Sequence, residues 1–331
     1  MIGSAEALPG DEDELEEAAP EAVQDWSGEI LPQWAGWRLD RALVALYPGY
    51  SRSHLQSLVE EGRVGLDGAP CPQAARKLRL GQRLQVQWRA PQHEVPFAPE
   101  ALPIDILFED AHLLILNKPA GWVVHPAAGN WSGTLLNALL AHHEAARLLP
   151  RAGIVHRLDK DTSGLMVVAK SVATYHALVA QLAAREVGRE YMALCHGRVE
   201  QAFSVDAPIG RDPRSRVRMA VVSDGKPART DFTPLAVGAA SSLLHCRLHS
   251  GRTHQIRVHA ASRGLPLVGD ALYGGRELAG MQRQALHAAR LRLQHPVRGV
   301  ALSWSVAPPA DFLAAASALV GWSGGGLSEG L

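Results

Sequence analysis

A loop rich in ionisable side chains lies between two short apolar runs near the middle of the chain. Residues 156–163 read HRLDKDTS, with Ile-Val at 154–155 before them and LMVVA at 165–169 after them. Short apolar runs beside polar turns predict buried strands, and a loop held between strands is a common place for catalytic residues. Local turns would explain the Asp and Ser residues. They do not explain why a His, an Arg and a Lys crowd into the same loop.

The charge of the chain is distributed unevenly. Its formal net charge is zero, but residues 1–30 hold ten Asp and Glu and no Lys or Arg. The rest of the chain therefore carries 33 Lys and Arg against 23 Asp and Glu. A basic body favours a polyanionic partner. The acidic segment, rich in Ala, Glu and Pro, is predicted to be a disordered tail over residues 1–30.

Cysteine usage and hydropathy predict the cellular compartment of the protein. Cys71, Cys195 and Cys246 are odd in number and widely spaced, which favours a reducing environment without a disulfide framework. The N-terminus carries acids where a signal peptide would carry bases, and no apolar run reaches membrane-spanning length. We therefore expect a cytoplasmic protein that does not enter a membrane.

Residues 31–89 predict a first folded domain. Apolar residues at helical spacing follow Arg38 and again follow Ser51, which stands where it could cap the second helix. The Asp67-Gly68 dipeptide, next to alternating apolar residues, predicts a tight hairpin turn. Four prolines between residues 90 and 103 then predict an extended linker.

Residues 104–315 predict a second, larger domain of the α+β class. Several apolar runs read as strands, and Thr134, Ser171 and Thr253 each stand where they could cap a helix. Strands and helices mix without a regular βαβ rhythm. We therefore expect a mixed, largely antiparallel central sheet with flanking helices. The Gly-rich end, residues 316–331, is expected to be a flexible tail.

Five stretches of this second domain together resemble the pseudouridine synthases that share an HRLD signature. They are HRLDKDTSGLMVVAK, LNKPAGWVVHPAAGN, GREYMALCHG, LHSGRTHQIRVHAASRGLPLVGDALYGG and QALHAARLRLQHP. The resemblance covers most of residues 112–297 and implies a pseudouridine synthase fold. It implies isomerisation of uridine in large-subunit (23S) ribosomal RNA, in the helix 69 stem-loop near the decoding site. It also implies no cofactor and no metal, because the reaction neither oxidises uridine nor adds a group.

The resemblance assigns roles to residues of the expected site. Asp159 supplies a carboxylate that either bonds to the nucleoside or removes a sugar proton. Arg252 would pair with Asp159 and fix its orientation, and Tyr191 would stack on the uracil. Arg157 would enter the RNA helix and fill the space left by the flipped nucleotide, whereas His156 is expected to be structural.

The first domain resembles the S4 RNA-binding module. The resemblance lies in RLDR at the first helix, SR at the second, and EEGRVGLDG and LRLGQRLQV after it. It implies that side chains of this small domain contact the RNA backbone. The candidates are Arg38, Arg41, Ser51, Arg52, Arg63 and Lys77. The expected partner is therefore ribosomal RNA, bound by a monomer.

Two other functions fit parts of the sequence. The DKDT at residues 159–162 has the DxDxT spacing of Mg²⁺-dependent phosphotransferases, although their first Asp follows a strand directly and here HRL intervenes. A non-catalytic protein that only grips ribosomal RNA would carry the same S4 module, but it would not need the carboxylate, tyrosine and arginine set. His254 and His259 are five residues apart, off one helical face, and do not favour a metal site.

Overall fold

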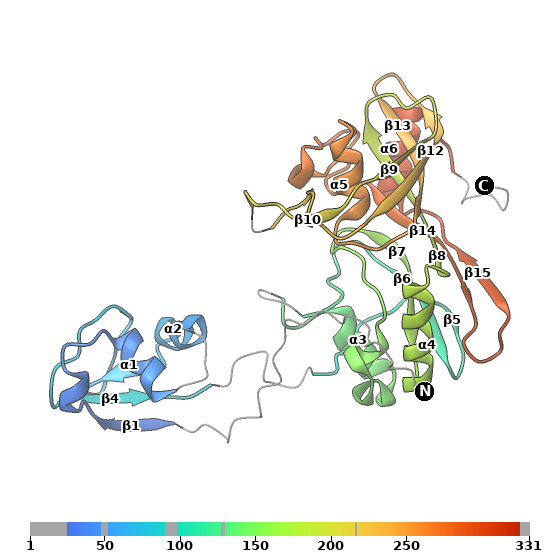
Figure 1. Cartoon of the computed structure of the whole chain (residues 1–331). Coiled ribbons are helices and arrows are strands. Elements are labelled where there is room, and N and C mark those ends of the chain that lie inside the picture. The colour runs from blue at the N-terminus through green and yellow to red at the C-terminus, as the bar shows by residue number, and fades with distance from the viewer. Residues whose placement is uncertain (1–24, 48–51, 90–97, 127–129, 216, 325–331) are drawn as a thin grey trace, which may run out of the picture. The chain divides into compact units, whose positions relative to one another are not determined.

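The computed structural model describes residues 25–47, 52–89, 98–126, 130–215 and 217–324. The chain forms two compact units, residues 1–96 and residues 97–331 (Figure 1). The boundary between the units lies inside the proline-rich segment 90–103. Each unit has a hydrophobic core of its own.

The first unit combines two short helices with an antiparallel sheet. Its elements are β1 (Trp26–Glu29), η1 (Pro32–Trp34), α1 (Leu39–Leu46), α2 (Arg52–Glu60), β2 (Val64–Leu66), β3 (Ala69–Pro70) and β4 (Arg83–Val86). The strands lie in the order β1-β4-β2-β3. Leu43 of α1 and Leu58 of α2 are fully buried in one cluster with Val64 and Leu84 of the sheet. The predicted helical spacing thus corresponds to the buried faces of α1 and α2.

The predicted hairpin turn joins β2 to β3. Asp67 and Gly68 have φ angles of 54° and 83°, the left-handed conformation that a two-residue hairpin turn needs at both central positions. The Asp67 carboxylate also accepts hydrogen bonds from the Arg83 N–H (2.8 Å) and from Gln82 Nε2 (2.9 Å). These bonds tie the turn to the start of β4, and the predicted turn is confirmed.

The folded part of the first unit begins before residue 31. Residues 26–29 form β1, whose Trp26 lies opposite Val86 and whose Glu29 lies opposite Arg83. Ile30 is 1% exposed and belongs to the core. The predicted disordered tail over residues 1–30 is therefore wrong for its last residues, because pairing with β4 and burial of Ile30 order them.

The second unit is built on a nine-stranded mixed sheet. In spatial order its strands are β5 (Ile106–Glu109), β6 (Leu113–Lys118), β7 (Ser163–Ala169), β14 (Leu286–Gln294), β8 (Gly188–His196), β13 (Ser241–Leu248), β12 (Arg229–Val237) and β9 (Phe203–Asp206), and β15 (Ala301–Ser305) also pairs with β14. A separate ribbon consists of β10 (Ile209–Arg211) and β11 (Met219–Val221). All strand pairs of the large sheet are antiparallel except β7 with β14. The predicted α+β class with a mixed, largely antiparallel sheet is confirmed.

Helices flank this sheet (Figure 1). They are α3 (Leu135–His142), η2 (Glu144–Leu148), η3 (Pro150–Gly153), α4 (Val172–Ala183), α5 (Gln255–Ser262), η4 (Ala271–Tyr273) and α6 (Ala310–Val320). Thr134 caps α3 and Ser171 caps α4, as predicted. In each case the side chain accepts a hydrogen bond from the backbone N–H three residues later, at Asn137 and Thr174.

The central strands are buried on both faces. Along β7, Met166 and Val168 belong to one hydrophobic cluster, and Leu165 and Val167 belong to another. Alternate residues of a strand point to opposite faces, so an uninterrupted apolar run covers both faces at once. This double burial makes β7 a rigid support for the loop that precedes it.

The second unit begins before residue 104, its predicted start. The Ala98 carbonyl accepts a hydrogen bond from Asn137 Nδ2 (2.9 Å), and the Glu100 carboxylate accepts one from the Gly133 N–H (3.0 Å). These contacts attach residues 98–100 to the start of α3. The predicted linker over 90–103 is therefore too long, because capping contacts of this kind leave no periodic pattern in the sequence.

The second unit also continues past residue 315, its predicted end. α6 extends to Val320, and its Phe312, Ala315 and Ala316 are fully buried. The flexible tail predicted for residues 316–331 is therefore wrong at its start. The small alanines of this helix pack against the core, although their hydrophobic signal in the sequence is weak.

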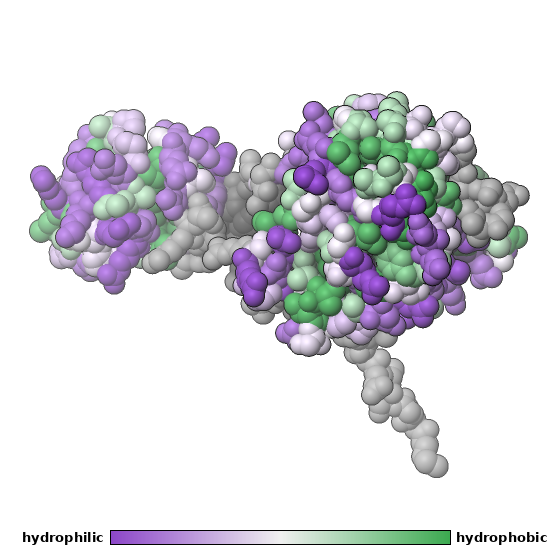
Figure 2. Space-filling model, turned by 90° about the horizontal axis from the view of Figure 1, so that it is seen from above, coloured by the Kyte–Doolittle hydropathy of each residue, from purple (hydrophilic) through white to green (hydrophobic). Residues whose placement is uncertain are grey.

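The faces of the two units that Figure 2 shows differ in polarity. In Figure 2 the visible face of the first unit is mostly hydrophilic, whereas the visible face of the second unit mixes hydrophilic and hydrophobic patches. Among the residues that the structure describes, no helix is long and apolar enough to cross a membrane.

Candidate active site

Asp159 lies in a loop whose backbone is fixed by its neighbours. The Gly121 N–H donates a hydrogen bond to the Lys160 carbonyl (2.9 Å), and the Thr162 N–H donates one to the Asp159 carbonyl (3.1 Å). The strand that follows, β7, is hydrogen-bonded between β6 and β14. Asp159 is thus presented at the end of a central strand, on a loop with little conformational freedom.

Lys118, at the end of β6, is a fully buried cation that contacts this loop. Its Nζ donates hydrogen bonds to the carbonyls of Pro119 (2.7 Å), Trp122 (3.0 Å) and Lys160 (2.9 Å). Burial lowers the pKa of Lys118 to about 7, although two nearby carboxylates act in the opposite direction. Three carbonyl acceptors match the three N–H groups of an ammonium. The side chain therefore joins the turn after β6 to the loop that carries Asp159.

A second cation holds the next peptide group of the loop. Arg283 Nη1 donates a hydrogen bond to the Asp161 carbonyl (2.8 Å). Its Nε and Nη2 bind the two carboxylate oxygens of Asp311 at 2.8 and 2.9 Å. Asp311 lies in the first turn of α6. The loop is thereby connected to the last helix that the structure describes.

The Asp159 carboxylate forms an ion pair with Arg257 of α5. Arg257 Nη1 lies 3.0 Å from Asp159 Oδ2, and its Nε and Nη2 lie 2.7 and 2.8 Å from the two carboxylate oxygens of Asp270. Asp270 is only 2% exposed. Burial alone would lower the pKa of Arg257, but Asp270 and Asp159 together raise it. Asp270 therefore fixes a guanidinium whose remaining N–H group orients Asp159.

The predicted ion pair between Arg252 and Asp159 is wrong, because Arg257 makes this contact. Arg252 lies before α5 begins. Its backbone N–H donates to Gln255 Oε1 (3.0 Å), and its Nε donates to the Pro227 carbonyl (3.2 Å). The structure therefore does not bring Arg252 to the carboxylate.

The start of α5 explains this difference. Thr253 was the expected cap, but the helix begins at Gln255 and its N-cap is His254, with a left-handed φ of 55°. No side chain caps the helix from the N-cap position. The sequence did contain a signal for Arg257, since it stands between apolar residues in a helix that is buried nearly all round. A buried arginine in such a place needs a carboxylate partner.

His254 joins the group around Asp159, although the sequence did not single it out for catalysis. Its Nε2 lies 3.8 Å from Asp159 Oδ1, and its Nδ1 lies 2.7 Å from the Tyr273 hydroxyl. That hydroxyl accepts a hydrogen bond from the Met219 N–H (2.9 Å), so its own proton can go to Nδ1. Burial lowers the pKa of His254 overall. When the Tyr273 hydroxyl donates to Nδ1, a neutral His254 carries its proton on Nε2, on the side of Asp159.

Tyr191 lies on β8 and is 6% exposed. Burial raises the pKa of its hydroxyl, the cation of Arg189 opposes this rise, and Asp159 adds to it. The phenol is therefore neutral at physiological pH. Tyr191 also packs in the same hydrophobic cluster as Leu158, the residue before Asp159, so the two predicted residues lie in one region of the unit.

The residues just before Asp159 have different surroundings. Arg157 is exposed, whereas Leu158 is buried. His156 Nε2 accepts a hydrogen bond from the Val167 N–H (3.1 Å). Burial, helped by Arg189, lowers the pKa of His156 to about 3, so the ring is neutral. These contacts agree with a structural role for His156 and leave Arg157 accessible to RNA.

Three candidate RNA contacts of the first unit lie on its exposed surface. The backbones of Arg38 and Lys77 pair in an isolated bridge, and both side chains are exposed. Arg38 also pairs with Asp40 (2.8 Å). The guanidinium of Arg41 lies 4.0 Å from the ring centroid of Trp37. The bridge therefore places two of the predicted basic side chains next to each other.

Of the remaining RNA-contact candidates of the first unit, the structure describes only Arg63 in full. Arg63 lies 3.1 Å from Glu61, just after α2. Ser51 and the side chain of Arg52 lie outside the described residues. An exposed ion pair such as that of Arg63 is worth little, so it would not prevent contact with a phosphate.

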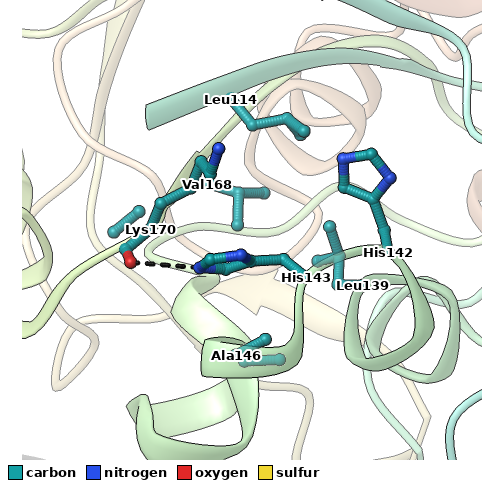
Figure 3. Close-up of a pocket in the computed structure, with 9 residues that line it drawn as sticks. Leu114, Leu139, His142, His143, Ala146, Val168 and Lys170 are labelled. Atoms are coloured by element: carbon teal, nitrogen blue, oxygen red, sulfur yellow. Dashed lines mark hydrogen bonds between the residues drawn. The ribbon is translucent and has the colours of Figure 1, made fainter. Parts of the chain in front are cut away.

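A pocket elsewhere in the second unit is not part of this site (Figure 3). Its lining residues are Leu114, Leu139, His142, His143, Ala146, Ala152, Val168, Ala169 and Lys170. Its polar groups have partners: His143 Nε2 lies 3.2 Å from the Lys170 carbonyl, and Lys170 Nζ lies 2.7 Å from Glu109. Across the described part of the chain, no group of three or more His, Cys, Asp or Glu is arranged to hold a metal ion.

Known proteins define the class to which this fold and site belong. A family model described as RNA pseudouridylate synthase matches residues 112–262, a range that includes Asp159, Tyr191 and Arg257. The solved structure of human RNA pseudouridylate synthase domain containing 1 is similar, with a TM-score of 0.50 and 27% identity, and the match covers 62% of this chain and 84% of that one. The chain belongs to the RNA pseudouridylate synthase family. The predicted family and the predicted class of RNA isomerase are confirmed.

Three relatives that match along most of the chain are each named ribosomal large subunit pseudouridine synthase D. The one from Nitrosomonas europaea is 49% identical over 293 residues, which are 86% of this chain and 85% of the relative. The one from Yersinia pestis is 44% identical over 306 residues, with coverage of 88% and 94%. The one from Escherichia coli (strain K12) is 44% identical over 291 residues, with coverage of 84% and 89%. The phosphotransferase and non-catalytic alternatives are therefore wrong.

Proposed function

We propose that this protein isomerises uridine to pseudouridine at specific positions of large-subunit (23S) ribosomal RNA. The observation that carries the proposal is the Asp159 carboxylate, held 3.0 Å from Arg257 Nη1 and close enough to raise the pKa of Tyr191. The names of the three relatives support the choice of RNA. Within that RNA, we propose the helix 69 stem-loop as the target.

The isomerisation of uridine requires three functions from the site. The N1–C1′ bond of uridine breaks, the detached uracil turns, and its C5 bonds to C1′. The site has to supply a carboxylate that acts at the sugar, a cation that orients this carboxylate, and a surface that retains the free base. Asp159, Arg257 and Tyr191 supply these three functions.

Asp159 acts in one of two ways. Its carboxylate either bonds to the nucleoside or removes a proton from the sugar. Oδ2 is engaged by Arg257, whereas Oδ1 has His254 Nε2 at 3.8 Å. Oδ1 is therefore the oxygen that remains available to the substrate in both routes.

The target uridine has to leave its base stack before it can reach Asp159. Arg157 is exposed on the same loop, two residues earlier, and fills the vacated position in the RNA. The ring of Tyr191 stacks on the flipped base. The residues of one short loop thus both open the RNA and act on the nucleotide that is released.

The first unit acts as an S4-type RNA-binding module in this proposal. Its exposed Arg38, Arg41 and Lys77 contact phosphates, and its mostly hydrophilic face suits such a partner (Figure 2). The protein works as a monomer in the cytoplasm, where ribosomal RNA is assembled with its proteins.

A genetic experiment tests the proposed function. Pseudouridines are mapped in 23S rRNA from cells that lack this gene and from the same cells carrying the wild-type or the Asp159→Asn gene. We expect specific pseudouridines of helix 69 to disappear and to return only with the wild-type gene. An unchanged map would refute the ribosomal substrate, and restoration by Asp159→Asn would refute the role of the carboxylate.

A further inference from the structure

Strand β8 carries an arginine, Arg189, two residues before Tyr191. Since alternate residues of a strand share a face, Arg189 and Tyr191 point to the same side of the sheet. Glu190 points to the other side, where it is buried beside His245 and Arg290. Arg189 therefore belongs to the face that carries the base-stacking tyrosine.

Arg189 is half-buried, and it differs from the buried Arg257 and Arg290 of this unit because it has no carboxylate partner. Arg257 pairs with two aspartates, and Arg290 pairs with Glu190. Within the described ranges, no Asp or Glu oxygen lies within 4.0 Å of the Arg189 guanidinium. Its buried Nε also lacks a hydrogen-bond partner. An unpaired buried cation is costly, and such an exception to normal pairing requires an explanation.

The backbone opposite Arg189 leaves room for its guanidinium. A Cβ atom on Gly251, which follows β13, would lie 2.4 Å from Arg189 Nη1. A larger residue at position 251 would therefore displace the guanidinium. The glycine allows Arg189 to occupy a place that no acidic side chain shares.

Arg189 affects the pKa values of His156 and Tyr191, and both of these groups are neutral. The pKa of His156 is lowered to about 3, first by burial and then by Arg189. The pKa of Tyr191 is raised by burial, against the effect of Arg189. Burial also lowers the pKa of Arg189 itself. Arg189 is thus a desolvated cation, and no carboxylate among the described residues balances its charge.

We propose that Arg189 is a catalytic residue that holds the negative charge of the detached uracil. This inference rests on the proposed function and deepens it. When the N1–C1′ bond breaks, its electron pair leaves with N1, and the charge spreads to uracil O2 and O4. Arg189 donates hydrogen bonds to this anion while Tyr191 stacks on its face. When C5 bonds to C1′, C5 loses its proton, N1 gains one, and the charge disappears.

A phosphate is the other anion that RNA could offer to Arg189. Phosphates contribute to affinity before any reaction occurs, whereas the uracil anion forms only as the glycosidic bond breaks. The half-buried position of Arg189, two residues from Tyr191 on the same strand face, favours the base. An exposed residue such as Arg157 is better placed for the RNA backbone. Measuring affinity and chemical rate separately distinguishes the two ligands.

The test uses the full chain with Arg189 replaced by Met, Lys or Ala. Arg198→Met is the matched control, because Arg198 is exposed and pairs with Glu200. The probe is a 23S rRNA transcript labelled with tritium at uridine C5, and the readouts are its Kd and the single-turnover release of tritium. Arg189→Met should lower the rate by about 100-fold or more and change Kd only a few-fold. Arg189→Lys should retain an intermediate rate, and free guanidinium ion should partly restore Arg189→Ala relative to equal NaCl.

Other results would overturn the proposal. A wild-type rate in Arg189→Met would show that the guanidinium does not assist the reaction. A loss confined to Kd would assign Arg189 to a phosphate. A lowered Tm with no recovery in Arg189→Lys or with guanidinium would assign it a structural role. If the wild-type protein released no tritium, the proposed function itself would fail, which distinguishes that failure from these.

Discussion

The two oxygens of Asp159 have different neighbours, Arg257 Nη1 at 3.0 Å and His254 Nε2 at 3.8 Å. Asp159→Asn keeps the shape of the side chain but removes the charge that acts at the sugar. We expect it to abolish tritium release from RNA labelled at uridine C5. Its Kd for RNA should stay within a few-fold of wild type, because phosphates supply most of the affinity. Appreciable turnover by this variant would exclude Asp159 as the catalytic carboxylate.

Arg257 should matter far more than Arg252. Arg257→Ala leaves Asp159 and the buried Asp270 without their common partner, and breaking a buried pair costs on the order of 3–5 kcal/mol. We expect a lower Tm and a single-turnover rate reduced by orders of magnitude at saturating RNA. Arg252→Ala is the matched control and should stay close to wild type in both measurements. Equal damage from the two changes would contradict the assignment.

Single residues could be predicted where the sequence pattern shows which loop or strand carries them. Asp159 stands in a loop between apolar strands, and Tyr191 stands in a strand, so both were expected near the sheet, where they lie. Arg257 was missed because it depends on helical phase. The N-cap is His254, one residue after the expected Thr253, so Arg252 stays outside α5, and Arg257 in its first turn meets the carboxylate.

At the scale of elements, the strands were more predictable than their order. The apolar runs at 113–116, 190–194 and 243–248 all became strands. The place of β14 between β7 and β8 was not readable, because it depends on parallel pairing between segments far apart in the sequence. Ser163 Oγ and His287 Nδ1 meet at 2.9 Å across this pairing. Local patterns predict such strands but not their neighbours.

The turn between β5 and β6 contacts His295, which follows β14, and this contact gives a prediction about pH. The Asp110 carboxylate accepts hydrogen bonds from the N–H groups of His112 (2.7 Å) and Leu113 (2.9 Å) and contacts His295 Nε2 (2.8 Å). Burial alone would raise the pKa of Asp110, but these hydrogen bonds lower it to about 2. The folded pKa is below the unfolded value, so the stabilisation is complete above about pH 4 and is lost as the pH falls toward 2.

Asp110→Asn should therefore lower the free energy of unfolding by up to about 2 kcal/mol at pH 7. The difference from wild type should shrink at pH 3. Urea unfolding at both pH values measures this change. Asp224→Asn is a suitable control, because Asp224 is exposed. A difference of the same size at pH 7 and pH 3 would show that the charge of Asp110 does not stabilise the turn.

At the scale of the whole molecule, the two units should be separable. Each has its own core, and the boundary falls after residue 96. A fragment of residues 97–331 should fold, because it keeps the contacts of Ala98 and Glu100 with α3. It should bind structured rRNA more weakly and with a shallower salt dependence, since phosphate contacts are lost, yet turn over normally at saturation. Wild-type affinity, or binding without turnover, would contradict this division of roles.

The acidic N-terminus should oppose RNA binding. Residues 1–24 contain eight Asp and Glu and no Lys or Arg. Removing these residues leaves β1 intact and should tighten nonspecific RNA binding at low salt, because a repulsive charge is lost. The effect should vanish at high salt. A salt titration of Kd measures it, and an unchanged Kd at low salt would show that the segment does not act through its charge.

Arg283 joins the Asp161 carbonyl to the Asp311 carboxylate by hydrogen bonds. These bonds lead to a prediction about when activity appears during synthesis of the chain. Translation proceeds from the N-terminus, so the peptide group beside Asp159 is made long before the helix that completes its support. A nascent chain that has not yet released α6 should therefore modify rRNA more slowly than the complete chain. Chains that end at residue 309 mimic this stage and should release tritium more slowly than the full chain. Equal rates would show that the last helix does not govern the onset of catalysis.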